Sequence, residues 1–382
     1  MSAQRPDDAL PPATQGGGER YSQELSRSLS LRGNILITLS SVTPASSVFI
    51  IIPSVLAAVG GASFLAFVAA GLVGVCMAFC YAELSSAFPI AGGEYSFAAR
   101  VLGKGTGFAL FLMNALSLIL IIGVIALGTG QYLATAISGA DSKWVGVGVI
   151  VVCSIVAVLN IRTNAWVTAT FLTLEMAALV VLTALGFLHV SRPVSTLFQP
   201  QTMGANGVLT SVGLGLVAVQ TATAIFAYNG YGAAVYFSEE TKNAAKGVAR
   251  AILWSLAITV AAELIPLTAV ILGAPDLGTL ISDPAPMQYF VTALGGSALN
   301  TVISLAIALA IINAVVAITL QAGRTVLVVD NGENKNLSLG LRNLKGVTLM
   351  PTRDVNPYHL LGHQSVLLSE AAARKFSEAL SK

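Results

Sequence analysis

Two carboxyl side chains lie inside long apolar runs of this 382-residue sequence, where an acid could do chemistry. Glu175 lies in the run 166–189 and Glu263 in the run 249–272. In a helix that crosses a bilayer, a charge at the centre costs about 2.5–3.5 kcal/mol. Such a group is therefore either a neutral, hydrogen-bonded packing residue or a carrier of protons. The sequence leaves both interpretations open, and Glu175 is the candidate for proton coupling.

Two further apolar runs contain residues that interrupt a helix. In the run 34–56, Pro44 has no amide proton, and its ring clashes with the carbonyl group four residues earlier. In the run 208–237, Gly230 and Gly232 lie beside Asn229 and permit unusual backbone angles. Each interruption alone could be an ordinary kink or a close helix contact, because Gly and Pro are common in membrane helices.

The two interruptions together indicate a binding site. They lie in the first and sixth apolar runs, which begin two successive groups of five. Breaks at corresponding places in two halves of a chain point to a transporter site built from half-helices. Amide donors freed at one break suit a carboxylate, and carbonyl groups freed at the other suit an ammonium group. No nucleophile–base pair, metal-ligand cluster or phosphate loop is present, so we expect neither an enzyme nor a cofactor.

Composition requires these runs to lie in a membrane. Hydrophobic residues make up 55% of the chain and charged residues 10%, against about a quarter charged in soluble domains. Runs of about 20 apolar residues span the hydrocarbon core as helices, which pair their own backbone groups. The predicted spans are 34–56, 63–84, 105–133, 144–161, 166–189, 208–237, 249–272 and 298–322.

Basic residues predict the orientation of these spans. Eleven Lys and Arg residues lie in the N-terminal tail, in the even-numbered gaps and after the eighth span, and two lie in the odd-numbered gaps. This bias places both ends of the membrane region in the cytoplasm of a multi-pass protein of the cell membrane. Residues 1–32 are polar, lack the pattern of a signal peptide and are expected to form a disordered cytoplasmic tail.

Several short motifs are similar to those of a known family. They are the segments 81–84 (YAEL), 88–95 (FPIAGGEY) with Gly103, 226–232 (FAYNGYG), 239–243 (EETKN) and 250–252 (RAI). They resemble amino acid–polyamine–organocation (APC) superfamily permeases over about residues 30–325. The resemblance implies an all-α polytopic membrane protein with the leucine-transporter-type inverted-repeat fold, incomplete after about eight helices. It also implies secondary active transport of an amino acid or related amine, possible proton coupling, and a lipid bilayer as surroundings.

The resemblance also implies where the substrate binds. The substrate-binding residues would be Thr43, Pro44, Ala45, Ser46, Ser47, Phe226, Tyr228, Asn229 and Gly230. Phe226 would be an aromatic lid, and Asn229 and Gly230 would lie in the helix-six break. Glu175 resembles a helix-five carboxylate of part of the family. The family's Gly-rich helix-one motif is replaced here by residues 43–47.

The chain changes character after residue 325. Segments 325–330, 347–350 and 365–368 read as strands, and 334–343 and 369–380 read as helices, which predicts a small C-terminal α/β fragment. Phrases in 327–361 resemble the end of ribosomal protein L-four of the large subunit, with its first half absent. The seven Lys and Arg residues here form no basic stripe, so no nucleic acid is expected as a partner.

The expected organisation is therefore a tail (1–32), a permease domain (33–325) and a ribosomal-protein-like segment (326–382), with an apparent fusion near 323–326. The alternative to a transporter is a truncated, non-transporting membrane fragment fused to a ribosomal-protein tail. A third hypothesis, an RNA-binding protein, is opposed by the eight apolar spans.

Overall fold

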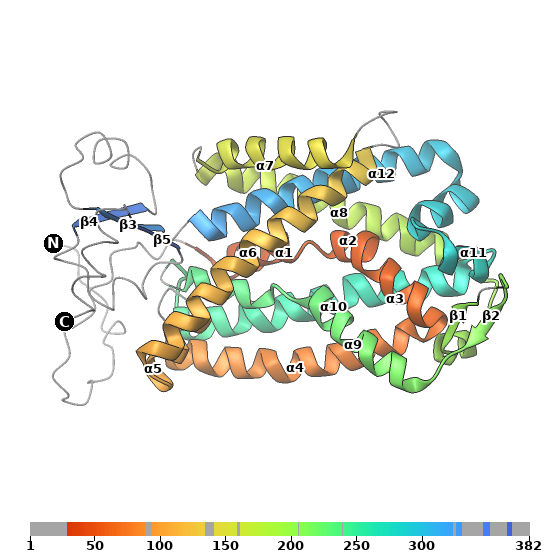
Figure 1. Ribbon diagram of the computed structural model, residues 1–382, viewed down its shortest axis with the longest axis horizontal. Helices are drawn as coiled ribbons and strands as arrows, with labels where there is room; N and C mark the ends of the chain where they lie inside the picture. The colour runs from red at the N-terminus through yellow and green to blue at the C-terminus, as the bar shows by residue number, and fades with distance from the viewer. Residues whose placement is uncertain are drawn as a thin grey trace, which may run out of the picture.

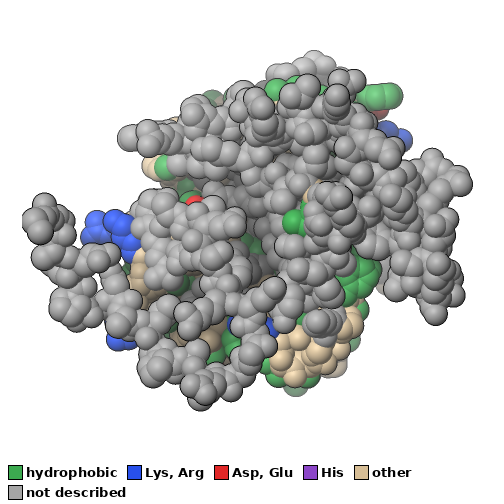
Figure 2. Space-filling model, turned by 90° about the vertical axis from the view of Figure 1, so that its left-hand side faces the viewer, with side chains coloured by type: hydrophobic (Ala, Val, Ile, Leu, Met, Phe, Trp, Pro, Cys, Tyr) green, Lys and Arg blue, Asp and Glu red, His purple; other side chains and the backbone are tan. Residues whose placement is uncertain are grey.

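The structure, a computed structural model, describes residues 29–88, 93–133, 141–158, 161–204, 206–238, 240–323, 326–330, 347–351 and 365–368. Long helices lie side by side in one bundle, with strands β1 and β2 at one end and β3, β4 and β5 at the other (Figure 1). Lys and Arg side chains of described residues show on the end that lies at the left in Figure 1 (Figure 2).

The first predicted span is a series of short helical segments. They are α1 (Leu31–Val42), α2 (Pro44–Ser46), the π-helical turn η2 (Ser47–Ile51) and α3 (Ile52–Val59). Helix α1 begins at Ser30, whose hydroxyl oxygen accepts a hydrogen bond from the Gly33 amide at 3.2 Å, as an N-cap does. The turn η3 (Gly60–Ala62) then leads into α4 (Ser63–Ala87).

The remaining helices follow with short connections. They are α5 (Gly93–Val101), α6 (Lys104–Leu133), α7 (Ser142–Val158), α8 (Ile161–Leu188), η4 (Val194–Phe198), α9 (Leu214–Tyr228), η5 (Tyr231–Phe237), α10 (Ala244–Gly273), α11 (Leu277–Ser282) and α12 (Pro286–Gly323). Strands β1 (Gln201–Met203) and β2 (Leu209–Ser211) pair antiparallel between η4 and α9. Helix α12 bends at Gly296, whose φ is 81°.

Five helical stretches of the described residues are long and apolar enough to cross a membrane. They are Leu31–Ala87, Gly105–Gly130, Ala169–Leu188, Ala244–Gly273 and Pro286–Val316. The first contains two predicted spans. The predicted span 144–161 corresponds to α7, which has 17 residues. The predicted span 208–237 corresponds to α9, which has 15 residues because it ends at a break. A polytopic, mainly helical membrane protein is thus confirmed, and the number of eight spans stays a prediction.

Small residues bring α8 and α10 close together. A Cβ on Gly186 would lie 2.3 Å from the Ala269 carbonyl oxygen, and one on Gly273 would lie 2.5 Å from the Gly186 carbonyl oxygen. Only glycine fits such a contact, and small residues are the usual means of close helix packing in membranes. This contact holds together the two helices that carry Glu175 and Glu263.

The C-terminal strands form a parallel sheet. Strands β3 (Val326–Asp330), β4 (Val347–Pro351) and β5 (Ser365–Leu368) lie in the order β4–β3–β5, with β3 parallel to both neighbours. All three predicted strands are present. The helices predicted over 334–343 and 369–380 lie outside the described residues.

Candidate functional site

The predicted break in the first span is confirmed at Thr43. Helix α1 ends there because Thr43 has a φ of 48°, in the left-handed region that non-glycine residues seldom adopt. Pro44 occupies the first position of α2, where a missing amide proton costs nothing. The helix therefore restarts at Pro44 in a new direction, with its first turn buried in the protein.

The predicted break in the sixth span is also confirmed. Helix α9 ends at Tyr228, Asn229 is extended, and Gly230 has a φ of 117° before η5 begins. The Asn229 side-chain oxygen accepts a hydrogen bond from the Gly230 amide at 2.8 Å. Glycine is required here because a side chain strains this backbone conformation.

The two breaks lie against each other. A Cβ on Gly230 would lie 3.0 Å from Val42 Cγ2 and 3.2 Å from Val42 Cα. The Ser47 hydroxyl donates a hydrogen bond to the Ala227 carbonyl oxygen at 3.0 Å, across 180 residues of sequence. A residue just after the first break therefore satisfies a carbonyl group at the end of α9, and the two interruptions form one site.

Glu175 reaches this site from α8. Its side chain is fully buried, and Oε1 accepts a hydrogen bond from the Ala45 amide at 2.8 Å. The first amides of a helical segment have no partner within the helix, so an oxygen from elsewhere must satisfy them. Oε2 of Glu175 has no hydrogen-bond partner. The side chain thus binds the start of the segment 44–59 with one oxygen and keeps the other free.

Glu263 reaches the same site from α10. It is fully buried, and neither of its carboxyl oxygens has a hydrogen-bond partner. It interacts electrostatically with Glu175 and Tyr228 and lies near Ser47. The Ser47 hydroxyl has a single proton, which goes to Ala227, so Ser47 does not donate to Glu263.

Sequence reasoning noted Glu263 but did not join it to the site. The missed signal is a spacing of four residues: Ser255, Thr259 and Glu263 lie on one face of α10, and all three are fully buried. None of their side-chain oxygens has a hydrogen-bond partner. A polar stripe of this kind in an apolar helix indicates a face turned toward other polar groups rather than lipid.

The two predicted aromatic residues are placed differently. Tyr228 is 1% exposed and packs edge-on against Phe67, with ring centroids 5.4 Å apart. Its hydroxyl group has no hydrogen-bond partner. Phe226 is 49% exposed, although it lies only two residues earlier on α9. The structure thus brings Tyr228 together with Glu263 and leaves Phe226 on a more open face.

A second set of motif residues meets around Glu94. Its Oε2 accepts a hydrogen bond from the Tyr236 hydroxyl at 2.6 Å, and its Oε1 accepts one from the Tyr81 hydroxyl at 3.2 Å. The Asn114 side-chain amide donates to the Tyr236 hydroxyl oxygen at 2.7 Å. This network joins α4, α5, α6 and η5, and it links the motif residues Tyr81 and Glu94 to Tyr236, which lies between the motifs 226–232 and 239–243.

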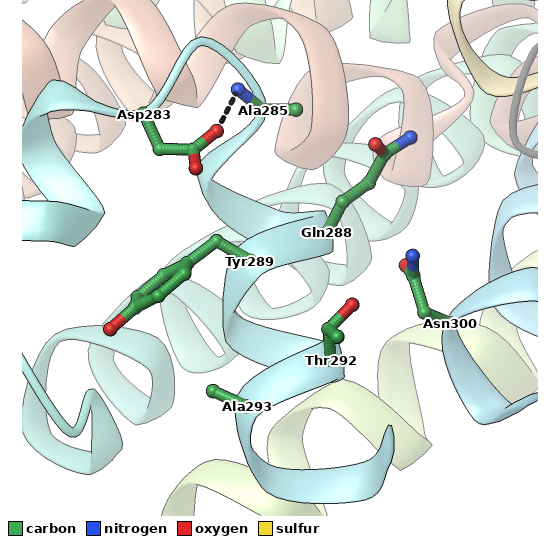
Figure 3. Close-up of a pocket in the computed structure, with 7 residues that line it drawn as sticks. All are labelled: Asp283, Ala285, Gln288, Tyr289, Thr292, Ala293 and Asn300. Atoms are coloured by element: carbon green, nitrogen blue, oxygen red, sulfur yellow. Dashed lines mark hydrogen bonds between the residues drawn. The ribbon is translucent and has the colours of Figure 1, made fainter. Parts of the chain in front are cut away.

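One hollow of the molecule lies away from the breaks. A cavity of about 370 Å³ is lined by residues of α12 and of the connection before it. Its lining is Asp283, Ala285, Gln288, Tyr289, Thr292, Ala293 and Asn300. Figure 3 shows these side chains. Asp283 faces this cavity with one carboxyl oxygen bound to the Ala285 amide at 2.7 Å. No residue of the two breaks lines it.

Comparison with known proteins identifies two families in the chain. Residues 29–327 match the amino acid permease family, and residues 289–379 match the ribosomal protein L4/L1 family. The two matches overlap within α12 and just after it, where the fusion was predicted near 323–326.

Individual relatives divide in the same way. A methylthioribose transporter of Bacillus subtilis is 27% identical over 62% of this chain and 53% of its own length. An uncharacterised transporter of Mycobacterium tuberculosis is 26% identical over 80% of this chain and 66% of its own length. The large ribosomal subunit protein uL4 of Solibacter usitatus is 81% identical over 63 residues, which are 16% of this chain and 30% of that protein.

The chain thus spans between about half and two thirds of these transporter relatives, and under a third of uL4. The family match and the relatives named as transporters are those of membrane transport proteins rather than of enzymes. The chain belongs to the amino acid permease family and carries a C-terminal segment similar to ribosomal protein uL4.

Proposed function

We propose that the permease region carries out secondary active transport of amino acids or related amines across the cell membrane. The contact between the two breaks carries this proposal: Gly230 lies against Val42, and two buried acids beside the breaks have carboxyl oxygens without hydrogen-bond partners. Broken helices at corresponding positions suit a leucine-transporter-type inverted repeat, in which one repeat moves against the other around the substrate.

Proton coupling through Glu175 is the second part of the proposal. Its carboxyl group is fully buried, holds the Ala45 amide and retains one free oxygen. A change in the charge of Glu175 would therefore change its hydrogen bond to Ala45, at the start of the segment that begins at Pro44. Acids in such positions of membrane helices serve as proton relays.

The substrate class is open within this proposal. The relative named as a methylthioribose transporter takes a sugar derivative according to its name, whereas the family name refers to amino acids. The test is the uptake of radiolabelled amino acids, amines and methylthioribose into proteoliposomes, with and without an inward proton gradient. Gradient-driven accumulation of one of them is expected. Binding without uptake would favour the alternative of a non-transporting fragment.

The termini are proposed to be cytoplasmic. The support is the bias of Lys and Arg residues in the sequence and their presence at the end of the bundle viewed in Figure 2. The uL4-like segment is proposed not to bind RNA, because its seven basic residues are scattered. An RNA-binding assay with the whole chain in detergent tests this, and salt-sensitive binding would refute it.

A further inference from the structure

Glu175 stands where a substrate carboxylate would otherwise bind. A zwitterion needs free amide donors at the break, and the donors nearest Pro44 are accounted for. The Thr43 amide donates to the Leu39 carbonyl oxygen at 2.9 Å, Pro44 has no amide proton, and the Ala45 amide donates to Glu175. The protein thus fills this donor position with its own carboxyl group.

Two amides at the break of the sixth span are occupied as well. The Asn229 amide donates to the Phe226 carbonyl oxygen at 3.1 Å, and the Gly230 amide donates to the Asn229 side chain. A substrate carboxylate that bound either amide would have to displace its acceptor. It would also lie near the acid pair, where like charges disfavour a third carboxylate.

Acceptors without partners are in excess at the same place. They are Glu175 Oε2 and both carboxyl oxygens of Glu263. The hydroxyl groups of Tyr228 and Ser46, which can donate as well as accept, also lack partners. Each of the four side chains is at least 95% buried. Buried polar atoms are normally hydrogen-bonded, so a group of unpartnered acceptors points to a missing donor. No Lys, Arg or His among the described residues acts on either carboxyl group.

We propose that Glu175 and Glu263 determine specificity by excluding ligands that carry a carboxylate and by holding one ammonium group. This inference rests on the proposed function and narrows it to cationic amines. An ammonium group brings three donors and a positive charge, which match the unpartnered oxygens and offset the repulsion between two buried acids. Glu175 plays two roles here: Oε1 occupies the Ala45 amide, and Oε2 faces the amine with Glu263.

Matched ligand pairs test the inference. Calorimetric binding to the purified full chain in detergent compares leucine with 3-methylbutylamine, phenylalanine with phenylethylamine, and ornithine with putrescine. Within at least one pair, the amine is expected to bind roughly tenfold or more tightly than the amino acid, about the effect of one charge-assisted hydrogen bond. The alcohol 3-methylbutanol, which has the same skeleton without charge, is expected to bind no better than leucine.

Two substitutions at Glu175 separate its roles. Glu175→Gln keeps an oxygen for the Ala45 amide but removes the charge, so amine binding should weaken and amino acid binding should stay as it was. Glu175→Ala frees the Ala45 amide as well, so the preference should shift toward the amino acid. Glu83→Gln changes an exposed acid on α4 and serves as the control.

The possible results have distinct meanings. Amino acids that bind wild type as tightly as their amines in all three pairs, or an unchanged preference in Glu175→Ala, overturn the specificity inference and leave the transporter proposal intact. Absence of both binding and proteoliposome uptake for every ligand pair overturns both. A preference for amines that reverses in Glu175→Ala and not in Glu175→Gln is the result expected.

Discussion

Gly230 in the second break lies directly against Val42 in the first. The space is so limited that a Cβ on Gly230 would come within 3.0 Å of Val42 Cγ2 and 3.2 Å of Val42 Cα. The φ of 117° at Gly230 adds strain for any side chain. Contact between the two broken helices thus depends on a residue without a side chain.

Gly230→Leu should abolish substrate binding while the protein still inserts into the membrane. The leucine side chain would push Val42 away and separate the breaks, whereas insertion depends on the apolar length of the helices. Binding by calorimetry and abundance in the membrane fraction are the measurements. Gly215→Leu is the matched control, because a Cβ at Gly215 meets no atom within 4 Å. Unchanged affinity in Gly230→Leu would place the site elsewhere.

Glu175→Gln should remove the pH dependence of transport. Glutamine keeps the size of the side chain and an acceptor for the Ala45 amide, which Glu175 binds at 2.8 Å, but it cannot titrate. For the parent protein, protons compete with a cationic substrate for the Glu175 carboxyl group, so substrate affinity should fall as pH falls. Uptake and binding are measured as a function of pH between about 5.5 and 8. If the pH profile of the variant is identical to that of the parent, Glu175 is a packing residue and not the proton carrier.

The sequence predicted the breaks because proline and glycine act on their own backbone. Pro44 removes an amide proton and Gly230 permits a positive φ wherever they stand, so local chemistry was enough. The approach of Glu263 to Tyr228 could not be predicted in this way. It depends on how α10 rotates against α9 and α8, which is decided by contacts such as Gly186 with Ala269 that join distant parts of the chain.

The placement of aromatic residues was equally out of reach of local patterns. Phe226 and Tyr228 are both aromatic residues near the end of α9, and the family resemblance assigned both to the substrate site. Their exposures of 49% and 1% differ because residues two positions apart point to different sides of a helix. Which side faces α4 and Phe67 is a matter of tertiary packing. The role of Phe226 as a lid stays a prediction.

Both termini should be cytoplasmic. In a variant with Cys76, Cys80 and Cys153 replaced by serine, single cysteines introduced at Gln15 and at Lys375 should react with an impermeant maleimide only after cells are permeabilised. The physical reason is the excess of Lys and Arg on the retained side. A cysteine at Val194, which is 62% exposed in the connection before β1, should react in intact cells and serves as the positive control. Labelling at position 15 or 375 in intact cells would contradict the topology.

Asp276 should make the connection before α12 sensitive to acid. Its carboxylate caps α11, accepting hydrogen bonds from the amides of Gly278 at 3.2 Å and Thr279 at 2.9 Å and from the Thr279 hydroxyl. The Thr279 hydroxyl bond, followed by the amide bonds, holds the pKa of Asp276 below its ordinary value. A lowered folded-state pKa means that this stabilisation is complete above the unfolded value of about 3.9 and is lost as pH falls through the folded value.

Substitutions at Asp276 separate the cap from the charge. Asp276→Ala removes the cap and should lower the free energy of unfolding by about 0.5–2 kcal/mol near neutral pH. Asp276→Asn keeps a capping oxygen without charge, so its deficit against the parent should be smaller, and it should shrink as pH falls because the parent then loses its own charge. Thermal unfolding of the three proteins in detergent at pH 6 and at pH 3, which is about one unit below the unfolded pKa, measures both effects. A deficit of Asp276→Asn that stays constant between these pH values would show that the carboxylate charge does not stabilise the cap.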